Sequence, residues 1–381
     1  MDFHLTEGFD PDAFLRDYWQ KKPLLIRNPW REWANPLEPE ELAGLACEEG
    51  VEVRLVTQGS RGWAVEHAPI DEERFGELAR DHWTLLVQAV DQHVPDVADL
   101  IEPFRFIPDW RIDDVMVSYA ADGGGVGPHF DQYDVFLVQG LGRRRWRIGG
   151  RCDASSALVP DAPLRLLDGF EAVEEWVLGP GDILYLPPGI AHDGVAVGED
   201  CMTYSVGFRA PSRAELVDEW GAEPAEADDA DRYEDPDLVR QVNPGEISAA
   251  ALNRLFAMAG DAGDRAEFVR WFGEYNTTSK YPEVDWRPEE ATSADEVRAM
   301  LAAGVPVRRN PASRFAFIRE GECVLLFADG VGSECSGESA AFAEQLCAHK
   351  RIAFDPRLAK EEAVVELLAE LINQGCVAFD I

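Results

Sequence analysis

Short apolar runs alternate with polar residues through the middle of the chain, from residue 112 to residue 209. The runs read DVMVSYA, HFDQYDVFLV, RRWRIG, EEWVL, DILYLP and CMTYSVGF, and glycine and proline clusters separate them. A period of two residues is typical of β-strands, because successive side chains point to opposite faces of a sheet. Many short strands with such punctuation predict an all-β sandwich or barrel.

The N-terminal segment has a different pattern. Residues 10–20 predict a short helix, with Asp10 as its cap and Pro11 at its first position. The run KKPLLIR then predicts a strand that leaves this helix.

After Pro211 the apolar residues recur with helical spacing. Residues 212–282 are rich in acidic residues, and LNRLFAMA and AEFVRWFGEY are amphipathic helix candidates. Their apolar stripes lie outside the predicted barrel, so we expect a helical homodimer interface here.

The last hundred residues predict a small α+β domain. Ser293 and Glu296 form a capping box before a helix that ends at Gly304. RFAFIREGECVLLFADG predicts a β-hairpin, and EEAVVELLAELIN predicts a further helix that Gly375 ends. We therefore divide the chain into residues 1–211, 212–282 and 283–381.

Composition narrows the class of protein. The chain has 381 residues, is 46% hydrophobic and can bury a sizeable core. No apolar run approaches the ~18 residues of a membrane span, and MDFHLTEGFD lacks the order of a signal peptide. These features predict a cytoplasmic protein without membrane contact. The seven cysteines are odd in number and form no CxxC pair, so we expect reduced, mostly buried thiols.

The net charge of −37 is extreme. Phosphate groups would be repelled, so direct binding of nucleic acid is not expected. The acidic surface suits either adaptation to high salt or attraction of a basic protein, and the sequence does not separate the two.

Two segments carry metal-binding residues. In GGGVGPHFDQYDVF, His129 and Asp131 are two residues apart, so on a strand both side chains point to one face. In GDILYLPPGIAHDG, a strand runs into a tight Pro-Gly turn that should present His192 at the rim. Two histidines and one carboxylate, with three positions open, form the facial triad of non-haem Fe(II) oxygenases.

The combination is more specific than its parts. HxD alone arises often by chance, but HxD with a Gly/Pro-framed histidine about sixty residues later, in a β-rich stretch, is a strong signal. The remaining histidines have no such context and are interpreted as structural: His4, His67, His82, His93 and His349.

An oxygenase that uses a 2-oxo dicarboxylate also needs a cation for the distal carboxylate, and a bidentate arginine suits this role. The run RRRWRI offers four arginines, between which strand parity discriminates. Arg144 shares a face with the apolar Trp146 and Ile148, whereas Arg143, Arg145 and Arg147 share the other, solvated face. Arg144 is therefore the predicted anchor.

The same parity places Asp114, Met116 and Ser118 on one face of the strand DVMVS, and Tyr133 continues the face of His129 and Asp131. A carboxylate, a thioether and an aromatic ring suit a guanidinium on an aliphatic stem. Ordinary barrel packing is the competing interpretation for Met116 and Tyr133.

These segments resemble the cupin and JmjC proteins, and most closely the bacterial ribosomal oxygenases. The resemblance rests on DDVMVSYA, GGGVGPHFDQYDVFLVQG, GRRRWRIG, PGDILYLPPGIAHDG and YSVGFRAP, with FLRDYWQKKPLLIR and ARDHWTLLVQAV before them. It is dense over residues 1–211 and thinner beyond.

The resemblance implies a mostly β fold with added α structure. Its parts would be a double-stranded β-helix (jelly roll) core, a helical dimerisation region and a winged-helix-like C-terminal domain. It implies Fe(II), 2-oxoglutarate and O2, and hydroxylation of an arginine, at the β-carbon, of large-subunit ribosomal protein sixteen. It further implies that Ser118 binds the 2-oxoglutarate carboxylate and that Ser205 lies near the substrate arginine.

Three alternatives stay open. A histidine-hydroxylating relative would use the same chemistry, although Asp114 suits a cationic substrate better. A cupin that binds a metal without 2-oxoglutarate would usually show HxH and a further Glu ligand. A nucleic-acid-reading C-terminal domain is disfavoured, because residues 283–381 hold 10 Lys/Arg against 18 Asp/Glu, a net charge of −8.

Overall fold

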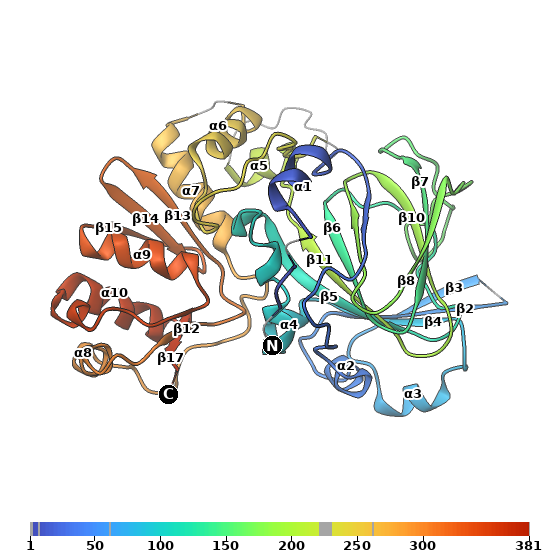
Figure 1. Ribbon diagram of the computed structural model, residues 1–381, viewed down its shortest axis with the longest axis horizontal. Coiled ribbons are helices and arrows are strands. Elements are labelled where there is room, and N and C mark those ends of the chain that lie inside the picture. Colours follow the sequence, from blue (N-terminus) through green and yellow to red (C-terminus); the bar gives the residue numbers. More distant parts are fainter. Residues whose placement is uncertain (1–2, 7, 61, 221–230, 261–262, 381) are drawn as a thin grey trace. The chain divides into compact units, whose positions relative to one another are not determined.

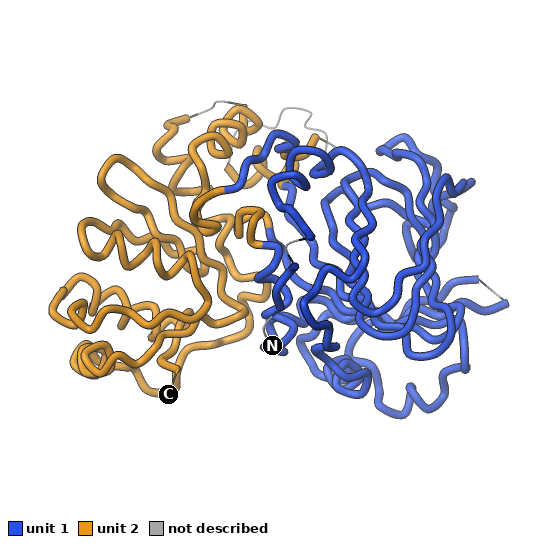
Figure 2. Tube along the Cα trace, in the orientation of Figure 1, with its two compact units in different colours: residues 1–104, 112–210, 234–240 blue, residues 105–111, 211–233, 241–381 orange. Residues whose placement is uncertain are grey.

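The computed structural model describes residues 3–6, 8–60, 62–220, 231–260 and 263–380. The chain forms two compact units (Figure 2). Unit 1 comprises residues 1–104, 112–210 and 234–240, and unit 2 comprises residues 105–111, 211–233 and 241–381. The acidic residues 221–230 of the predicted helical region lie outside the described residues.

Unit 1 is built on two antiparallel sheets. In the described residues, the larger sheet has the strand order β1-β9-β6-β11-β5-β4-β2-β3, and the smaller has the order β10-β7-β8 (Figure 1). The strands are β1 (Leu24–Ile26), β2 (Val53–Gly59), β3 (Gly62–His67), β4 (Trp83–Val87), β5 (Ile112–Ala120), β6 (Val135–Leu141), β7 (Arg144–Arg151), β8 (Glu174–Leu178), β9 (Ile183–Leu186), β10 (Ile190–Ala196) and β11 (Cys201–Phe208). The helices are α1 (Pro11–Asp17), α2 (Pro39–Ala46), α3 (Glu72–Glu77), η1 (Val90–Gln92), α4 (Pro95–Asp99) and η2 (Glu102–Phe104).

The inner faces of the two sheets share one apolar core. Val135 and Leu184 of the larger sheet belong to the same buried cluster as Trp146, Ile148 and Leu178 of the smaller sheet. Burial of apolar surface stabilises such a pairing by roughly 25 cal/mol per Å². Two antiparallel sheets around a common core form the predicted double-stranded β-helix.

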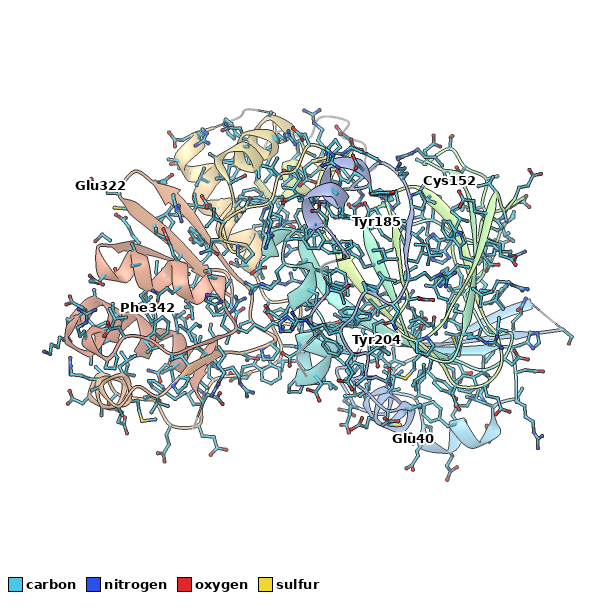
Figure 3. All side chains as sticks on the ribbon, viewed as in Figure 1. Glu40, Cys152, Tyr185, Tyr204, Glu322 and Phe342 are labelled. Atoms are coloured by element: carbon cyan, nitrogen blue, oxygen red, sulfur yellow. The ribbon has the colours of Figure 1, made fainter. Side chains whose placement is uncertain are left out.

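The N-terminal helix covers the outer face of the larger sheet. The carboxylate of Asp10 accepts hydrogen bonds from the N–H groups of Asp12 and Ala13, so the predicted cap is confirmed. Phe14 packs edge-on against Tyr185, with ring centroids 4.8 Å apart. Tyr185, labelled in Figure 3, is fully buried. Strand β6 is therefore buried on both faces, which explains its nearly continuous apolar sequence.

Unit 2 contains two three-stranded antiparallel sheets, with orders β16-β12-β17 and β13-β14-β15. Its strands are β12 (Val307–Arg309), β13 (Phe315–Glu320), β14 (Cys323–Ala328), β15 (Val331–Ser336), β16 (Arg351–Ile352) and β17 (Val377–Phe379). Its helices are η3 (Asp109–Arg111), α5 (Arg213–Trp220), α6 (Ala249–Met258), α7 (Arg265–Thr277), α8 (Ala294–Ala302), α9 (Glu338–Ala348), η4 (Pro356–Lys360) and α10 (Glu362–Asn373). The predicted capping box at Ser293, the β13–β14 hairpin and the last helix are all confirmed.

The apolar stripes of α6 and α7 do not remain free for a partner. Leu255 of α6 and Phe268 and Phe272 of α7 belong to a core cluster that also contains Phe327 of β14. Helix α7 approaches this sheet closely, since a Cβ at Gly273 would lie 2.4 Å from the Phe327 ring. The stripes lie outside the barrel, as predicted, but residues of unit 2 itself cover them, and the homodimer stays a prediction.

The cysteines behave as predicted. All seven are free thiols, and four of them are buried. Burial raises the pKa of Cys335 to about 11 and that of Cys347 to about 12, so neither is reactive near neutral pH. None of the helices in the described part of the chain has the length and apolarity that crossing a bilayer requires.

Candidate active site

The predicted metal-binding residues come from two adjacent segments of the barrel. His129 and Asp131 were expected on one regular strand, but β6 begins only at Val135. His129 instead forms an isolated antiparallel bridge with His192. Pro128 lacks a backbone N–H, and the preceding residues are rich in glycine, so a continuous ladder cannot form before His129.

His192 lies in strand β10, which begins directly after the Pro-Gly turn. Gly189 has φ +78°, a conformation that favours glycine, and its N–H donates to the carbonyl oxygen of Asp131 at 2.8 Å. The expected position of His192 at the rim is wrong, because its residue is only 3% exposed. Reciprocal backbone hydrogen bonds of 3.0 and 2.8 Å join His129 and His192, so the backbone itself fixes their separation.

The three side chains converge. Ligand atoms of His129, Asp131 and His192 all lie within 4.8 Å of one another, and no other such group occurs among the described residues. Nε2 of His192 is 3.7 Å from Oδ2 of Asp131. The two imidazole centroids are 4.3 Å apart.

The second nitrogen of each imidazole has its own partner. Nδ1 of His129 lies 2.9 Å from the carbonyl oxygen of Gly127, and Nδ1 of His192 lies 2.9 Å from that of Ile190. A carbonyl only accepts, so each Nδ1 carries the proton and each Nε2 keeps its lone pair for a ligand. Burial lowers the pKa of His192 to about 4, which keeps that imidazole neutral near pH 7.

A second group of polar side chains follows along the same face of the smaller sheet. In the register of β10 with β7, His192 pairs with Ile148, Gly194 with Trp146 and Ala196 with Arg144. The parity prediction is confirmed, since Arg144, Trp146 and Ile148 are buried, whereas the alternating Arg143, Arg145 and Arg147 are more exposed. Gly194 leaves room for the indole, because a Cβ there would lie 2.5 Å from the Trp146 ring.

Arg144 is buried and has no close counter-ion among the residues that the structure describes. It is 4% exposed, and its Nη2 is 3.5 Å from the Oγ of Ser118, at the limit of a hydrogen bond. Its Nε, like Nε1 of Trp146, has no hydrogen-bond partner among the described residues. Buried donors of this kind are costly unless a ligand satisfies them, and a carboxylate matches the guanidinium. The residues present therefore fit a dicarboxylate co-substrate.

The predicted substrate slot lies on the larger sheet. Asp114, Met116 and Ser118 alternate along β5, and Ser205 of β11 pairs with Met116 in register. Asp114 is 2% exposed, whereas Tyr133 is 43% exposed. The Asp131 carboxylate, partial burial of the hydroxyl and the Asp114 carboxylate raise the pKa of Tyr133, so its hydroxyl stays neutral.

Two residues that the sequence did not single out also reach this slot. Arg54 of β2 places its Nη2 3.8 Å from the Sδ of Met116. Gln88, which follows β4, donates from Nε2 to both carboxylate oxygens of Asp114, at 2.8 and 3.1 Å. Their only signal in the sequence is a polar residue within the apolar runs VEVRLV and LLVQAV.

Family models match both parts of the chain. A JmjC domain model matches residues 99–216, and a ROXA-like winged-helix model matches residues 260–378. A model of the AraC-like ligand-binding domain matches residues 172–267 and overlaps both.

Named relatives extend this similarity over the full chain. The sequence is 37% identical to the ribosomal protein uL16 3-hydroxylase of Escherichia coli, covering 100% of both proteins. It is 48% identical to a probable ribosomal oxygenase of Haemophilus influenzae over 57% of this chain and 54% of that protein.

Solved structures give the same result. An X-ray structure of E. coli YcfD matches with a TM-score of 0.80 and 34% identity, over 100% of both chains. The structure of YcfD, a ribosomal oxygenase, in complex with cobalt and 2-oxoglutarate matches with a TM-score of 0.76, also over 100% of both chains. The predicted fold, the predicted enzyme class and the predicted requirement for a metal ion and 2-oxoglutarate are all confirmed. The chain belongs to the ribosomal oxygenases, a JmjC-type family of Fe(II)- and 2-oxoglutarate-dependent enzymes.

Proposed function

We propose that this protein hydroxylates the β-carbon of an arginine in large-subunit ribosomal protein uL16. The observation that carries the proposal is that one barrel combines the His129–Asp131–His192 cluster with a slot walled by the buried Asp114 carboxylate. The name of the full-length E. coli relative, a uL16 3-hydroxylase, supports both the protein and the carbon position.

Nε2 of His129, Nε2 of His192 and a carboxylate oxygen of Asp131 would hold Fe(II) and leave three positions open. Bound iron, with a 2-oxo acid and O2, supplies the oxidising power that inserts oxygen into a C–H bond. The chain contributes neutral imidazoles, oriented by the carbonyl groups of Gly127 and Ile190.

Arg144 and Ser118 would bind the distal carboxylate of 2-oxoglutarate. The guanidinium can pair with a carboxylate in bidentate fashion, and the Ser118 hydroxyl can donate one further hydrogen bond. Trp146 lies between Arg144 and His192 on the same face of the sheet, so its ring would form the floor of the co-substrate site. Because Arg144, Ser118 and Trp146 are buried, they would shield the distal carboxylate of the co-substrate from water.

Asp114, Met116, Tyr133 and Ser205 would hold the substrate side chain. A buried carboxylate favours a cation, while the thioether and the aromatic ring contact an aliphatic stem and a planar guanidinium. A lysine ammonium matches this slot less well, because it is not planar and does not pair in bidentate fashion.

The surface of the protein suits a basic partner. Its net charge of −37 should speed encounter with a ribosomal protein, and salt should weaken this steering. We assign the encounter to the cytoplasm, before or outside ribosome assembly. The C-terminal domain, residues 283–381 with a net charge of −8, would then serve protein contacts or dimer support rather than nucleic acid.

The test uses purified enzyme with Fe(II), 2-oxoglutarate and matched uL16 peptides that carry Arg, Lys or His at the target position. We expect a product heavier by one oxygen, ~16 Da, with the Arg peptide alone. Hydroxylation of the His peptide but not of the Arg peptide would place the protein with histidine hydroxylases. Mass spectrometry of large-subunit proteins from cells with and without the gene then locates the residue.

A homodimer through the helical region, residues 212–282, is also part of the proposal. The core faces of α6 and α7 are used within the chain, but Trp220, Phe256, Trp271 and Tyr275 remain only partly buried. Partly exposed aromatic side chains of this kind are enriched at interfaces. Sedimentation at micromolar concentration, in moderate and in high salt, should give a dimer, and a monomer in both would refute it.

A further inference from the structure

Asp114 is a buried carboxylate that needs hydrogen-bond donors. Burying a charged group without hydrogen-bond donors costs roughly several kcal/mol. The groups around Asp114 therefore decide how well its charge is tolerated. Nε2 of Gln88 lies 2.8 Å from Oδ2 and 3.1 Å from Oδ1 of Asp114. The amide thus contacts both oxygens and fixes the plane of the carboxylate.

The backbone holds Gln88 firmly in this position. Strand β4 ends at Val87, which pairs with Val117, and the N–H of Gln88 then donates to the carbonyl oxygen of Glu52 at 2.9 Å. Ala89 adopts φ +51° and turns the chain into η1. In that turn the Asp91 carboxylate accepts a hydrogen bond of 2.7 Å from the N–H of Val115.

Residues 88–91 are therefore fastened to two successive positions of β5, 114 and 115. The hydrogen bond to Val115 sets the turn against the strand, and the Gln88 amide then reaches the neighbouring side chain. A donor anchored at both its backbone and its side chain is preorganised, so little further ordering is needed when a substrate binds.

The chemistry of the donor matters. An amide donates hydrogen bonds without carrying a charge of its own, so Gln88 orients the Asp114 carboxylate without adding a cation beside it. Asp114 and Met116 lie on the same face of β5, so the field of this carboxylate reaches the slot. A guanidinium between Tyr133 and Met116 would lie in the same field.

We propose that Gln88 is a positioning residue for the substrate: by orienting the Asp114 carboxylate, it makes the slot selective for a guanidinium. The inference rests on the proposed arginine hydroxylation. Gln88 acts through Asp114 and need not contact the reacting atoms.

The test is a double-mutant cycle between Gln88→Met, which keeps the side-chain length but removes the donors, and Asp114→Asn. With the Arg peptide, Gln88→Met should raise KM about 10-fold, as expected for a lost hydrogen bond to a charged group. The preference for the Arg peptide over the Lys peptide should shrink, while uncoupled 2-oxoglutarate decay and its KM stay unchanged. In the Asp114→Asn background, Gln88→Met should have almost no further effect.

Fully additive effects would show that Gln88 does not act through Asp114 and would overturn the inference. So would an equal loss in substrate hydroxylation and in uncoupled decay, because that pattern marks general damage to the fold. Gln88→Glu, which retains the shape but sets a carboxylate against Asp114, provides a second variant and should raise KM further. If the wild-type enzyme does not hydroxylate the Arg peptide at all, the proposed function fails, whereas wild-type activity with an unaffected Gln88→Met refutes this inference alone.

Discussion

The inner face of the barrel in unit 1 and the core of unit 2 are both buried, yet they are composed differently. The core around Phe342 of α9, labelled in Figure 3, is built mainly from apolar side chains and thiols, and Phe342 packs on Phe354 with ring centroids 4.4 Å apart. The barrel face instead carries two imidazoles, a carboxylate and a guanidinium whose Nε has no hydrogen-bond partner in the described residues.

This difference separates residues that stabilise the fold from residues that serve chemistry. Apolar burial lowers the free energy of the folded state, whereas a buried, incompletely paired charge raises it. Buried charged groups are retained where a ligand pairs with them. Without its ligands, the barrel face should therefore lower the stability of the fold, whereas the unit 2 core should not. Variants in the two regions should therefore affect different measurements.

The largest effect is expected at the metal cluster. His192→Ala or His129→Ala should lower 2-oxoglutarate turnover at least about 1000-fold, because a three-ligand site cannot lose a ligand and keep its ion. The melting curve should change little. His67→Ala, an exposed histidine of β3, is the matched control. Full activity in either purified ligand variant would refute the assignment.

The next effect concerns stability alone. Phe342→Ala should lower the free energy of unfolding by about 3–5 kcal/mol, the usual result of removing a large buried ring. Denaturant titration measures this, with Phe379→Ala, at the partly buried edge of the same core, as a milder control. The KM for 2-oxoglutarate of the folded fraction should not change, and a large change would show that the two regions are not separable.

Arg144→Met should have the opposite pattern of effects, on co-substrate binding and not on stability. The KM for 2-oxoglutarate should rise about 100-fold, since a charge-assisted bidentate pair contributes roughly 1.5–3 kcal/mol. The melting temperature of the ligand-free protein should not fall, because an apolar side chain replaces a buried, incompletely paired guanidinium. Arg143→Met, on the solvated face, is the control and should leave KM unaltered.

The smallest effect is expected at Ser118. Ser118→Ala should raise the KM for 2-oxoglutarate about 10-fold, the lower end of the cost of a hydrogen bond to a charged group, and leave kcat nearly constant. Steady-state kinetics measures both quantities. A loss as large as that of Arg144→Met would mean that the hydroxyl is a main anchor rather than an auxiliary one.

Patterns local to one segment were readable from the sequence. Strand parity found the buried face of Arg144, Trp146 and Ile148, and spacing found His129, Asp131 and His192 as a group. The caps at Asp10 and Ser293 were equally visible, because a helix end depends on a few neighbouring residues.

Features that depend on contacts between distant segments could not be predicted from the sequence. HFDQYDVFLV alternates like one strand, but its first half forms only an isolated bridge at His129 and single backbone hydrogen bonds, and the strand becomes regular only at Val135. Likewise, α6 and α7 have amphipathic patterns that do not say whether a partner chain or their own sheet covers them.

By itself the sequence determined the chemistry: which residue types are available, at which spacing, and on which face of their own strand. Only the tertiary structure decided that Gln88 reaches Asp114 and that Arg54 reaches Met116, because β2, β4 and β5 are brought together by sheet pairing across long stretches of chain. Parity along one strand is a local property of the backbone. Contact between side chains on different strands depends on sheet order and register, which no single segment encodes.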